Sequence, residues 1–340
     1  MRAARVQDGD VRVVDVAEPA PGPDEALVQV TAAGVCHSDL HLAKGDWFGM
    51  QVPELGHEGI GTVTALGPGA ERFVSIGDRV ILGLGGTGGG YWCGACEYCI
   101  GGSPRHCAQS KPVMGVFAER FAVYAPGLVV LPDEIGDHEA PLACAGLTAY
   151  GAIKKLSTHG VRVGSWVAIF GAAGGLGHYA VQLASAFGYR VLAIDIGADR
   201  LDFAQSLGAE RAVEPGEVAA VAEEVGGMHA SLVFSARIAA FQTGLDVLRK
   251  AGLFVGVGLP PTSEGDITIN PLVFLLKDPT VMFSGVGTVQ DMRELVDLAS
   301  RGVVHTHVSR TGRLTDLPAI LDELERSAFL GRAVITDLAG

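Results

Sequence analysis

The sequence predicts an α/β protein of two domains, one β-rich and the other built on a doubly wound parallel sheet. The chain has 340 residues, of which 48% are hydrophobic, so it is long enough for two separate cores. Up to about residue 140, short apolar runs alternate with turn residues, which is typical of β structure. After that point, strand-like apolar runs alternate with helical patterns, which favours a parallel sheet covered by helices.

In the first domain, four short apolar runs predict strands, over residues 26–32, 61–67, 78–83 and 120–125. Clusters of Gly, Pro and Asp separate these runs, among them PGPDE at 21–25. Helical patterns are scarce in this part of the chain, so we expect few helices here.

The second domain opens with a strand–turn–helix–strand unit. WVAIFG (166–171) is a continuous apolar run, as expected of a strand buried on both faces. A glycine-rich turn follows, then a helical segment that Gly188 ends, and then an apolar strand over 189–195. This βαβ order predicts parallel strands, and further strands are expected at 230–236 and 253–259.

The C-terminal segment predicts two helices and a strand. Thr288 is expected to cap a helix that Gly302 ends, and Thr315 to cap a second helix. The run AVITDLA (333–339) predicts a strand that rejoins the sheet of the first domain.

Composition narrows the functional class. The net charge is −13, and an acidic chain repels phosphate backbones, so we expect no nucleic-acid partner. No apolar run reaches the length that spans a bilayer, and the N-terminal residues lack the apolar region of a secretory signal. We therefore expect a cytoplasmic protein with no membrane partner, in a reducing compartment where clustered cysteines indicate metal binding or redox chemistry.

Four of the six cysteines lie in one glycine-rich stretch, residues 90–107. Cys93, Cys96, Cys99 and Cys107 are spaced C-x2-C-x2-C-x7-C, and two-residue gaps let thiolates converge on one tetrahedral ion. Four sulfur ligands favour Zn2+, with an iron–sulfur cluster as the other option. A zinc ion with four protein ligands has no open position and is structural. Four free thiols or a thioredoxin-like pair are the disfavoured alternatives.

The turn GAAGGLG (171–177) departs from the strict G-x-G-x-x-G pattern because its first loop is one residue longer. Gly174, Gly175 and Gly177 are present, and the turn lies between a buried strand and a helix whose N-terminus would bind pyrophosphate. Asp195 ends the next strand, 18 positions beyond Gly177, where it would bind the ribose hydroxyls and repel a 2′-phosphate. The pattern favours NAD over NADP. The alternative is an ordinary glycine-rich turn with a solvated aspartate.

Cys36 and Cys144 stand apart from the cysteine cluster. Isolated cysteines are usually buried as small apolar side chains. Cys36 lies in GVCHSDLH, however, Cys144 lies in APLACAGLTAYGA, and His57 lies in the turn-like GHEGIG. Two cysteines and one histidine are the ligand set of a catalytic zinc that keeps its fourth position open.

Together these segments resemble the zinc-dependent medium-chain alcohol dehydrogenases, and most of all their tetrameric, yeast-like microbial branch. The resemblance runs nearly end to end, through GVCHSDLH, GHEGIG, GDRV, the four-cysteine lobe, PLACAGLTAYGA, GAAGGLGHYAVQLA, GVGT and GRAV. It implies a GroES-like β-barrel catalytic domain plus a Rossmann domain with a doubly wound parallel sheet. The implied catalytic domain comprises 1–143 and 287–340, with the structural-zinc lobe at 90–107, and the NAD-binding domain comprises 144–286.

The resemblance also implies roles for single residues at the metal site. Cys36, His57 and Cys144 match the ligands of the catalytic zinc. Glu58 matches a carboxylate that can serve as an alternate ligand, and Asp39 matches the residue that orients the histidine ligand.

Further roles are implied for the proton path, the substrate and the cofactor. Ser38 and His41 match a proton relay through the nicotinamide ribose, and Thr148 matches a residue beside the nicotinamide. Trp47 and Trp92 match the pocket walls of enzymes that prefer small primary alcohols. The implied cofactor contacts are His37 and Arg332 at the pyrophosphate, Arg200 near the adenosine ribose, and Gly174, Gly175, Leu176, Gly177 and Asp195.

Three segments, 46–55, 108–120 and 276–285, depart from the family's usual sequence. The first carries Phe48 where a proline is usual, and the first two are shortened. They lie around the expected pocket and oligomer surfaces, so the sequence leaves the identity of the alcohol open.

The implied function is reversible hydride transfer between NAD and a primary alcohol or its aldehyde, in a homotetramer or a dimer. The nearest alternative is an NAD-dependent aldehyde reductase or formaldehyde dehydrogenase of the same superfamily. A zinc-free quinone or enoyl reductase is disfavoured because Cys36, His57 and Cys144 fill all three ligand positions. A zinc-binding structural protein without turnover is the alternative from another class.

Overall fold

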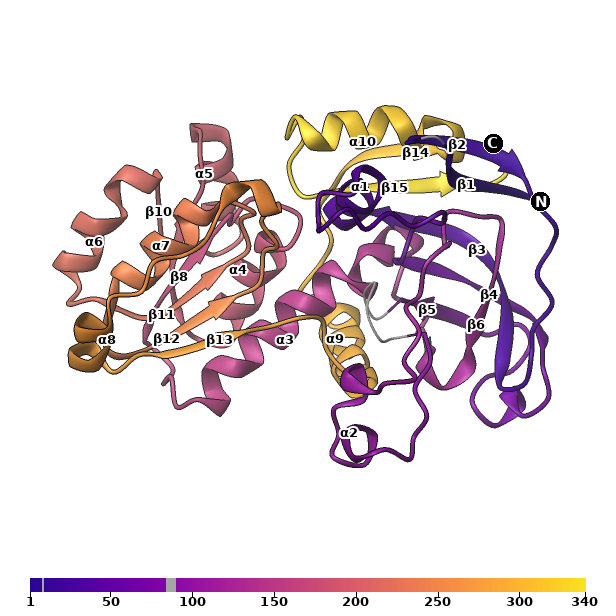
Figure 1. Ribbon diagram of the computed structural model, residues 1–340, viewed down its shortest axis with the longest axis horizontal. Coiled ribbons are helices and arrows are strands. Elements are labelled where there is room, and N and C mark those ends of the chain that lie inside the picture. The colour runs from indigo at the N-terminus through magenta and orange to yellow at the C-terminus, as the bar shows by residue number, and fades with distance from the viewer. Residues whose placement is uncertain (8, 84–89) are drawn as a thin grey trace. The chain divides into compact units, whose positions relative to one another are not determined.

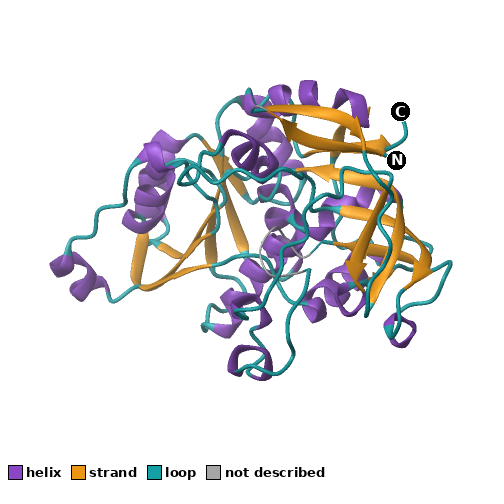
Figure 2. Cartoon of the chain, turned by 45° about the vertical axis from the view of Figure 1, so that its right-hand side comes forward, coloured by secondary structure: helices purple, strands orange, loops and turns teal. Residues whose placement is uncertain are grey.

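The computed structural model describes residues 1–7, 9–83 and 90–340, and these form two compact units (Figure 1). Unit 1 comprises Met1–Leu147 and Val286–Gly340, and unit 2 comprises Thr148–Gly285. Figure 2 shows the strands and helices of each unit. No helix of the described ranges is both long enough and apolar enough to cross a membrane.

Unit 1 is built mainly from strands. They are β1 (Arg2–Gln7), β2 (Asp10–Asp15), β3 (Glu25–Val35), β4 (Gly59–Leu66), β5 (Arg79–Leu82), β6 (Arg120–Tyr124), β7 (Val129–Val130), β14 (Val308–Arg313) and β15 (Arg332–Asp337). A seven-stranded sheet has the order β14-β15-β3-β4-β5-β7, with β6 also paired to β3, and β1 and β2 form a separate antiparallel pair. β15 pairs antiparallel with β3, which confirms that the C-terminal strand rejoins the first sheet.

Among the described residues, four α-helices lie in unit 1, and a fifth begins in unit 1 and ends in unit 2. They are α1 (His37–Lys44), α2 (Glu97–Ile100), α9 (Val289–Ser300), α10 (Leu317–Glu325) and α3 (Ala145–Thr158). Thr288 caps α9 as predicted, since its hydroxyl accepts the Asp291 N–H (3.1 Å). The predicted cap at Thr315 is wrong, and Asp316 occupies that position. The reason is a 3-10 turn over Leu314–Asp316, in which Asp316 already accepts the Arg313 N–H (2.9 Å).

Unit 2 is an α/β sandwich. Its strands are β8 (Trp166–Phe170), β9 (Arg190–Ile194), β10 (Arg211–Val213), β11 (Met228–Val233), β12 (Leu248–Gly256) and β13 (Thr280–Phe283). Its helices are α4 (Gly177–Ala186), α5 (Ala198–Ser206), α6 (Val218–Glu224), α7 (Ile238–Asp246) and α8 (Pro271–Lys277).

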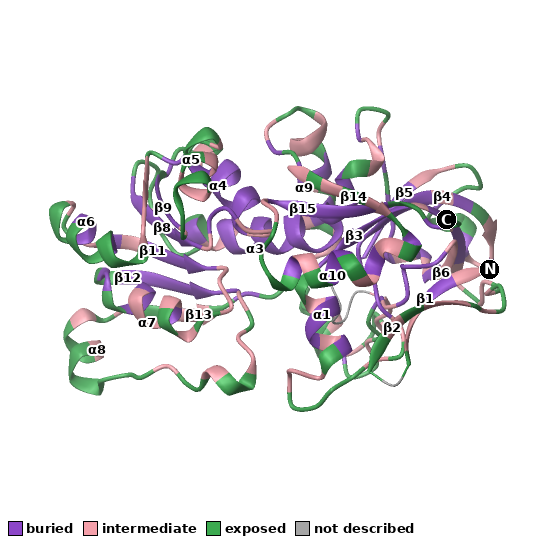
Figure 3. Cartoon of the chain, turned by 90° about the horizontal axis from the view of Figure 1, so that it is seen from above, coloured by how far each residue is buried: buried purple, intermediate pink, exposed green. Residues whose placement is uncertain are grey.

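The sheet of unit 2 has the strand order β10-β9-β8-β11-β12-β13, and every pairing is parallel. In chain order this is third, second, first, fourth, fifth, sixth, which is the order of doubly wound dinucleotide-binding sheets. All five residues of β8 are buried, as its continuous apolar run predicts, and Figure 3 shows β8 as a buried strand. The predicted fold class of unit 2 is therefore confirmed.

Candidate metal and cofactor sites

Cys36 lies at the junction between β3 and α1. Its backbone is extended (φ −118°, ψ 150°), and the helix begins at the next residue. The Cys36 N–H donates to Oδ2 of Asp39 (3.0 Å), and the Asp39 N–H donates to the Cys36 carbonyl (3.1 Å). These bonds satisfy N–H groups that the first helical turn leaves free, so they fix the cysteine where the strand ends.

The carboxylate of Asp39 connects Cys36 to His57. Its Oδ1 accepts the N–H of Gly56 (2.9 Å) and lies 3.2 Å from Nδ1 of His57. Gly56 has φ 90°, and a Cβ there would lie 2.6 Å from the backbone nitrogen of Phe117, so the turn requires glycine. Asp39 and His57 are fully buried, and the carboxylate on Nδ1 leaves Nε2 as the nitrogen available to a metal.

Glu58 follows His57 and is also fully buried. Its Oε1 accepts the N–H of Ala145 (3.2 Å), the residue after Cys144, and its Oε2 pairs with Arg332 at the start of β15. Burial raises the pKa of Glu58 to about 8, although the Arg332 guanidinium opposes that shift. The pair joins segments that are 274 residues apart in the chain.

The structure brings Cys36, His57, Glu58 and Cys144 together. One ligand atom of each lies within 4.8 Å of those of the others, and all four residues are buried. Neither ring nitrogen of His57 makes a hydrogen bond among the described residues; Nδ1 lies 3.2 Å from the Asp39 carboxylate, which leaves Nε2 for a metal. An unpaired buried polar group costs about 1–3 kcal/mol. A zinc ion would pair that nitrogen and would take two sulfur donors besides, a ligand set that zinc accepts. The residues therefore fit a zinc ion.

The ionisable groups of this site are coupled. A hydrogen bond from Cys144 lowers the pKa of Cys36 well below its ordinary value, and burial acts against that shift. The same hydrogen bond raises the pKa of Cys144, and burial adds to the rise. Burial lowers the pKa of His57, but the Asp39 carboxylate and Cys36 together outweigh this effect, and the net shift is upward. The lowered pKa of Cys36 favours its thiolate, the form of cysteine that binds metal.

The second cysteine cluster lies in the lobe around α2. Sγ of Cys96 lies 3.5 Å from Sγ of Cys99, which lies 3.9 Å from Sγ of Cys93. The Cys93 N–H donates to Sγ of Cys107 (3.5 Å), and all four sulfurs lie within 4.8 Å of one another as free thiols. Zinc–sulfur bonds of about 2.3 Å at tetrahedral angles place sulfurs roughly 3.8 Å apart. The lobe therefore has the shape that a tetrahedral zinc ion requires.

The thiols of the lobe differ in acidity. The backbone N–H groups of Ala95 and Cys96 lower the pKa of Cys93 to about 6, whereas burial raises the pKa of Cys99 to about 12. Metal binding removes the remaining thiol protons, so the affinity of the lobe for zinc rises with pH.

The glycine-rich turn joins β8 to α4. Gly171 has φ 75°, and a Cβ on Gly177 would lie 2.0 Å from the Gly171 carbonyl oxygen, so both positions require glycine. Gly174, Gly175 and Leu176 complete the turn, and α4 begins at Gly177. The N-terminus of α4 thus lies at the carboxyl end of the first parallel strand, where such sheets bind dinucleotides.

Asp195 follows β9, and its carboxylate is bound to the same turn. Oδ2 accepts the N–H of Ala173 (2.8 Å), and Oδ1 accepts the N–H of Ile196 (2.9 Å). Nη1 of Arg200 on α5 lies 4.0 Å from Oδ1. The structure therefore brings together the acidic residue, the arginine and the turn that the sequence singled out.

Three more predicted residues lie on α1. Oγ of Ser38 lies 3.8 Å from Sγ of Cys36, so the hydroxyl is beside the metal ligands. His41 is buried, and its ring centroid lies 4.9 Å from that of Trp47 and 6.2 Å from that of His37, which is exposed.

The remaining predicted residues lie on other elements. Trp92 is in the cysteine lobe, where its ring packs edge-on against Tyr124 at 5.2 Å. Thr148 is buried on α3, and the buried Arg332 pairs with Glu58.

Two residues near the metal site were missed by sequence reasoning. Asp46, in the turn after α1, hydrogen-bonds His41 (Nδ1–Oδ2 2.8 Å), but an aspartate after a glycine is typical of any turn. Gly34 leaves space for Glu58, since a Cβ there would lie 2.1 Å from Oε2 of Glu58. A glycine inside a strand pattern is a signal of such close approach.

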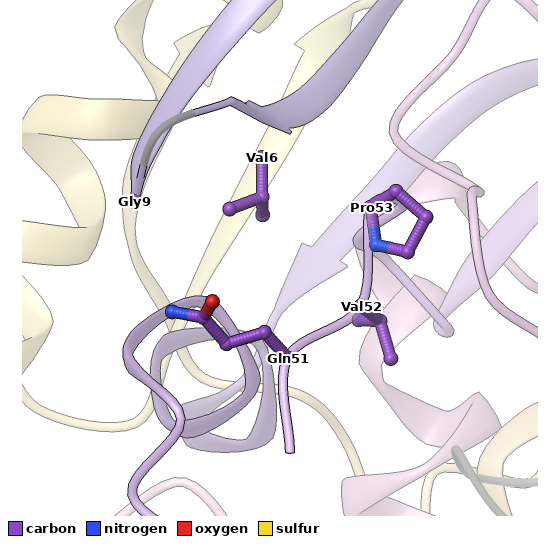
Figure 4. Close-up of a pocket in the computed structure, with 5 residues that line it drawn as sticks. All are labelled: Val6, Gly9, Gln51, Val52 and Pro53. Carbon is purple, nitrogen blue, oxygen red and sulfur yellow. The ribbon is translucent and has the colours of Figure 1, made fainter. Parts of the chain in front are cut away.

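A separate pocket of unit 1 lies between the β1–β2 turn and the segment after α1 (Figure 4). Its lining is Val6, Gly9, Gln51, Val52 and Pro53. None of these side chains ionises near neutral pH or is a usual metal ligand, so we assign no chemistry to this pocket.

Two family models match the chain. Residues 22–133 match the family described as alcohol dehydrogenase GroES-like domain, and residues 175–301 match the family described as zinc-binding dehydrogenase. An alcohol dehydrogenase of Geobacillus stearothermophilus is 37% identical over 351 aligned residues, covering 98% of this chain and 99% of that one.

Solved structures show the same similarity. The alcohol dehydrogenase of the archaeon Aeropyrum pernix has a TM-score of 0.88 at 30% identity, covering 99% of this chain and 100% of that one. The acetophenone reductase of Geotrichum candidum, solved in complex with NAD, has a TM-score of 0.85 at 29% identity. The alignment covers 99% of this chain and 97% of that one.

Proposed function

Because the chain belongs to the zinc-dependent medium-chain alcohol dehydrogenases, we propose that it transfers a hydride reversibly between NAD and a small primary alcohol. Its cofactors are zinc and NAD. One observation carries the proposal: Cys36, His57 and Cys144 meet in a buried site, with their ligand atoms within 4.8 Å of one another. Three such ligands leave one coordination position for a substrate oxygen.

At the metal site, Cys36, His57 and Cys144 would hold the catalytic zinc, which supplies Lewis acidity that lowers the pKa of an alcohol hydroxyl. Asp39 orients the His57 ring through Nδ1, and Glu58 is the alternate ligand within the same cluster. The four lobe cysteines, Cys93, Cys96, Cys99 and Cys107, would hold the structural zinc.

The proton of the alcohol leaves through Ser38 and His41. The Ser38 hydroxyl lies beside Cys36, and a hydroxyl can accept one proton while it donates another. His41 would then accept the proton on a ring nitrogen and release it to water, as a positioned general base does.

The cofactor contacts follow from the turn and the strand ends of unit 2. The N-terminus of α4 would bind the pyrophosphate of NAD, and Asp195 would bind the adenosine ribose hydroxyls. Bound NAD would supply the hydride acceptor through its nicotinamide ring. The remaining proposed contacts are Gly174, Gly175, Leu176, Gly177, Arg200, His37 and Arg332 with the cofactor, Thr148 beside the nicotinamide, and Trp47 and Trp92 as walls of the substrate pocket.

We also propose that the protein is a cytoplasmic homotetramer. No residue of α8 is buried, and the helix exposes Leu272, Leu275 and Leu276 by 63%, 77% and 65%. Among the described strands, β13 pairs only with β12, so its outer edge is open. Apolar side chains beside an open sheet edge support association with a second copy. A reducing compartment keeps the six cysteines available as thiols for metal.

The test is an assay of NADH formation with primary, secondary and aromatic alcohols and with formaldehyde, on protein of known zinc content. We expect turnover with small primary alcohols and two zinc ions per chain, one for each ligand cluster. Cys36→Ser should abolish turnover and keep the lobe zinc. Zinc-loaded protein that oxidises no alcohol would contradict the proposal and favour a structural zinc protein, and oxidation of formaldehyde alone would favour the aldehyde-specific alternative.

A further inference from the structure

The turn after α1 folds back onto His41. Gly45 ends the helix in the left-handed conformation (φ 73°, ψ 28°) and donates its N–H to the His41 carbonyl. The Asp46 N–H donates to the same oxygen (3.0 Å). A Cβ on Gly45 would lie 3.2 Å from Cγ of Gln51, so both the conformation and the space favour glycine. The backbone of this turn therefore holds Asp46 and Trp47 next to the His41 side chain.

Two side chains of the turn fix the His41 imidazole. Oδ2 of Asp46 lies 2.8 Å from Nδ1, and the Trp47 ring packs against the imidazole with centroids 4.9 Å apart and planes at 36°. The His41 side chain is only 11% exposed. A carboxylate is an acceptor, so Nδ1 carries the hydrogen, and Nε2, which makes no hydrogen bond within the described chain, is left as the basic nitrogen.

We propose that Asp46 is a positioning residue for alcohol oxidation, because it fixes His41 as the tautomer in which Nε2 accepts the proton. The inference rests on the proposed function, in which His41 removes that proton. When Nε2 takes the proton, the ring becomes an imidazolium that the Asp46 carboxylate stabilises through Nδ1–H. The proton then leaves Nε2 for water and the neutral tautomer returns, while Asp46 keeps its charge throughout. An aspartate that orients a histidine base in this way contributes through geometry and charge.

A double-mutant cycle separates this role from a structural one. The variants are Asp46→Asn, His41→Gln and the combination, with Glu325→Gln as the matched control, because Glu325 pairs with Lys44 at the end of the same helix. We expect Asp46→Asn to lower kcat/KM for alcohol oxidation by about 10–100-fold. In the His41→Gln background the same change should alter kcat/KM by less than about twofold, as should Glu325→Gln in the parent. Thermal stability and zinc content should stay at the parental values.

A spectroscopic measurement reports the tautomer directly. In protein labelled with 15N-histidine, the parent should show His41 protonated on Nδ1. Asp46→Asn should shift the proton to Nε2, because an amide N–H2 can donate to Nδ1. Asp46→Ser provides a second variant if the asparagine variant folds poorly.

Several outcomes would overturn the inference. One is an Asp46→Asn variant with the kcat/KM of the parent. Another is an equal loss of kcat/KM from Asp46→Asn in the parent and in the His41→Gln background. A third is a His41 tautomer that Asp46→Asn leaves unchanged. Parental activity in His41→Gln would overturn this inference together with the relay. If the parent oxidises no alcohol, the proposed function fails on its own, and the 15N spectra still decide whether Asp46 sets the tautomer.

Discussion

Asp39 and Glu58 are fully buried carboxylates, and each has its own partners. Asp39 accepts two backbone N–H groups, and Glu58 pairs with Arg332 and with one backbone N–H. A buried charge is tolerated only where such partners replace water, and removal of one partner from a buried pair costs several kcal/mol. The candidate metal ligands are thus positioned by buried carboxylates whose oxygens have polar partners.

The space around Glu58 gives a first prediction at this scale. Gly34→Ala places a Cβ 2.1 Å from Oε2 of Glu58 and 3.0 Å from Cγ of Pro141, so the carboxylate must move. Overpacking of this kind costs about 1–3 kcal/mol, and displacement of Glu58 should also lower turnover. Thermal denaturation and the NADH assay measure the two effects. Gly216→Ala is the control, since its Cβ meets no atom within 4 Å, and equal stability of the two variants would contradict the prediction.

Asp195 gives a second prediction. Asp195→Ala removes an acceptor of the ribose hydroxyls and a charge that repels a 2′-phosphate. Hydrogen bonds to charged groups contribute about 1.5–3 kcal/mol, so kcat/KM for NAD should fall roughly ten- to hundredfold while the preference over NADP narrows. Asp202→Ala, on the exposed side of helix α5, which follows Asp195 in the chain, should leave both values unchanged. If Asp195→Ala prefers NAD over NADP as strongly as the parent does, the proposed contact between Asp195 and the ribose is refuted.

Sequence patterns identified ligand candidates and not the partners that hold them. Cys36, His57 and Cys144 stand in short, distinctive segments, so a resemblance could single them out. The Glu58–Arg332 pair spans 274 residues, and no local pattern encodes a contact at that distance. Asp46 is close to His41 in sequence, but a turn aspartate carries no sign that its carboxylate faces an imidazole.

At the scale of elements, too, some features were predictable from the sequence and others depend on contacts between distant segments. The parallel strands β8, β9, β11 and β12 were predictable because burial on both faces demands continuous apolar runs. The short edge strands β10 and β13 were not predicted, and neither contains a buried residue. Helix α1 was not predictable either, because HSDLHLAK is short and has few apolar positions, and its formation depends on the Asp39 cap and on packing near α10. Short helices gain their stability mostly from tertiary contacts, which a sequence window does not contain.

The cysteine lobe gives a prediction at this scale. α2 has four residues and none of them is buried, so the lobe has little apolar core of its own and depends on its metal. Cys93→Ser should reduce zinc to about one ion per chain, lower the melting temperature, and expose the lobe to trypsin after Arg105. Zinc analysis, calorimetry and limited proteolysis measure these effects. Ser103→Ala in the same lobe is the control, and resistance of Cys93→Ser to trypsin would contradict the assignment.

At the scale of the whole molecule, two separate cores account for the division of the chain. The core of unit 1 gathers apolar side chains from β3, β4, β15 and α10, and the core cluster of unit 2 gathers them from alternate positions of β8 and β9 and from α6 and α7. The predicted fold class and family are confirmed at this scale, because strand order and apolar periodicity are global features that individual substitutions leave intact.

The exposed side of α8 gives a prediction for the assembly. The combined substitution Leu275→Glu and Leu276→Glu places two charges on the exposed apolar surface of α8, so self-association should weaken and the mass in solution should fall. Light scattering coupled to size exclusion measures that mass. Val163→Glu changes another exposed apolar side chain of unit 2 and should keep the parental mass. An unchanged mass in the double variant would place the interface elsewhere.

The position of β15 in its sheet has a consequence for biosynthesis. The strand lies between β14 and β3, and it carries Arg332 to Glu58. A ribosome therefore completes all six strands of unit 2 before it makes residues 332–337, and domains generally fold as units during synthesis. The nucleotide-binding unit can fold on a growing chain, whereas the metal-binding unit still has an open sheet edge and a buried glutamate without its guanidinium. Active-site assembly consequently waits for translation of β15.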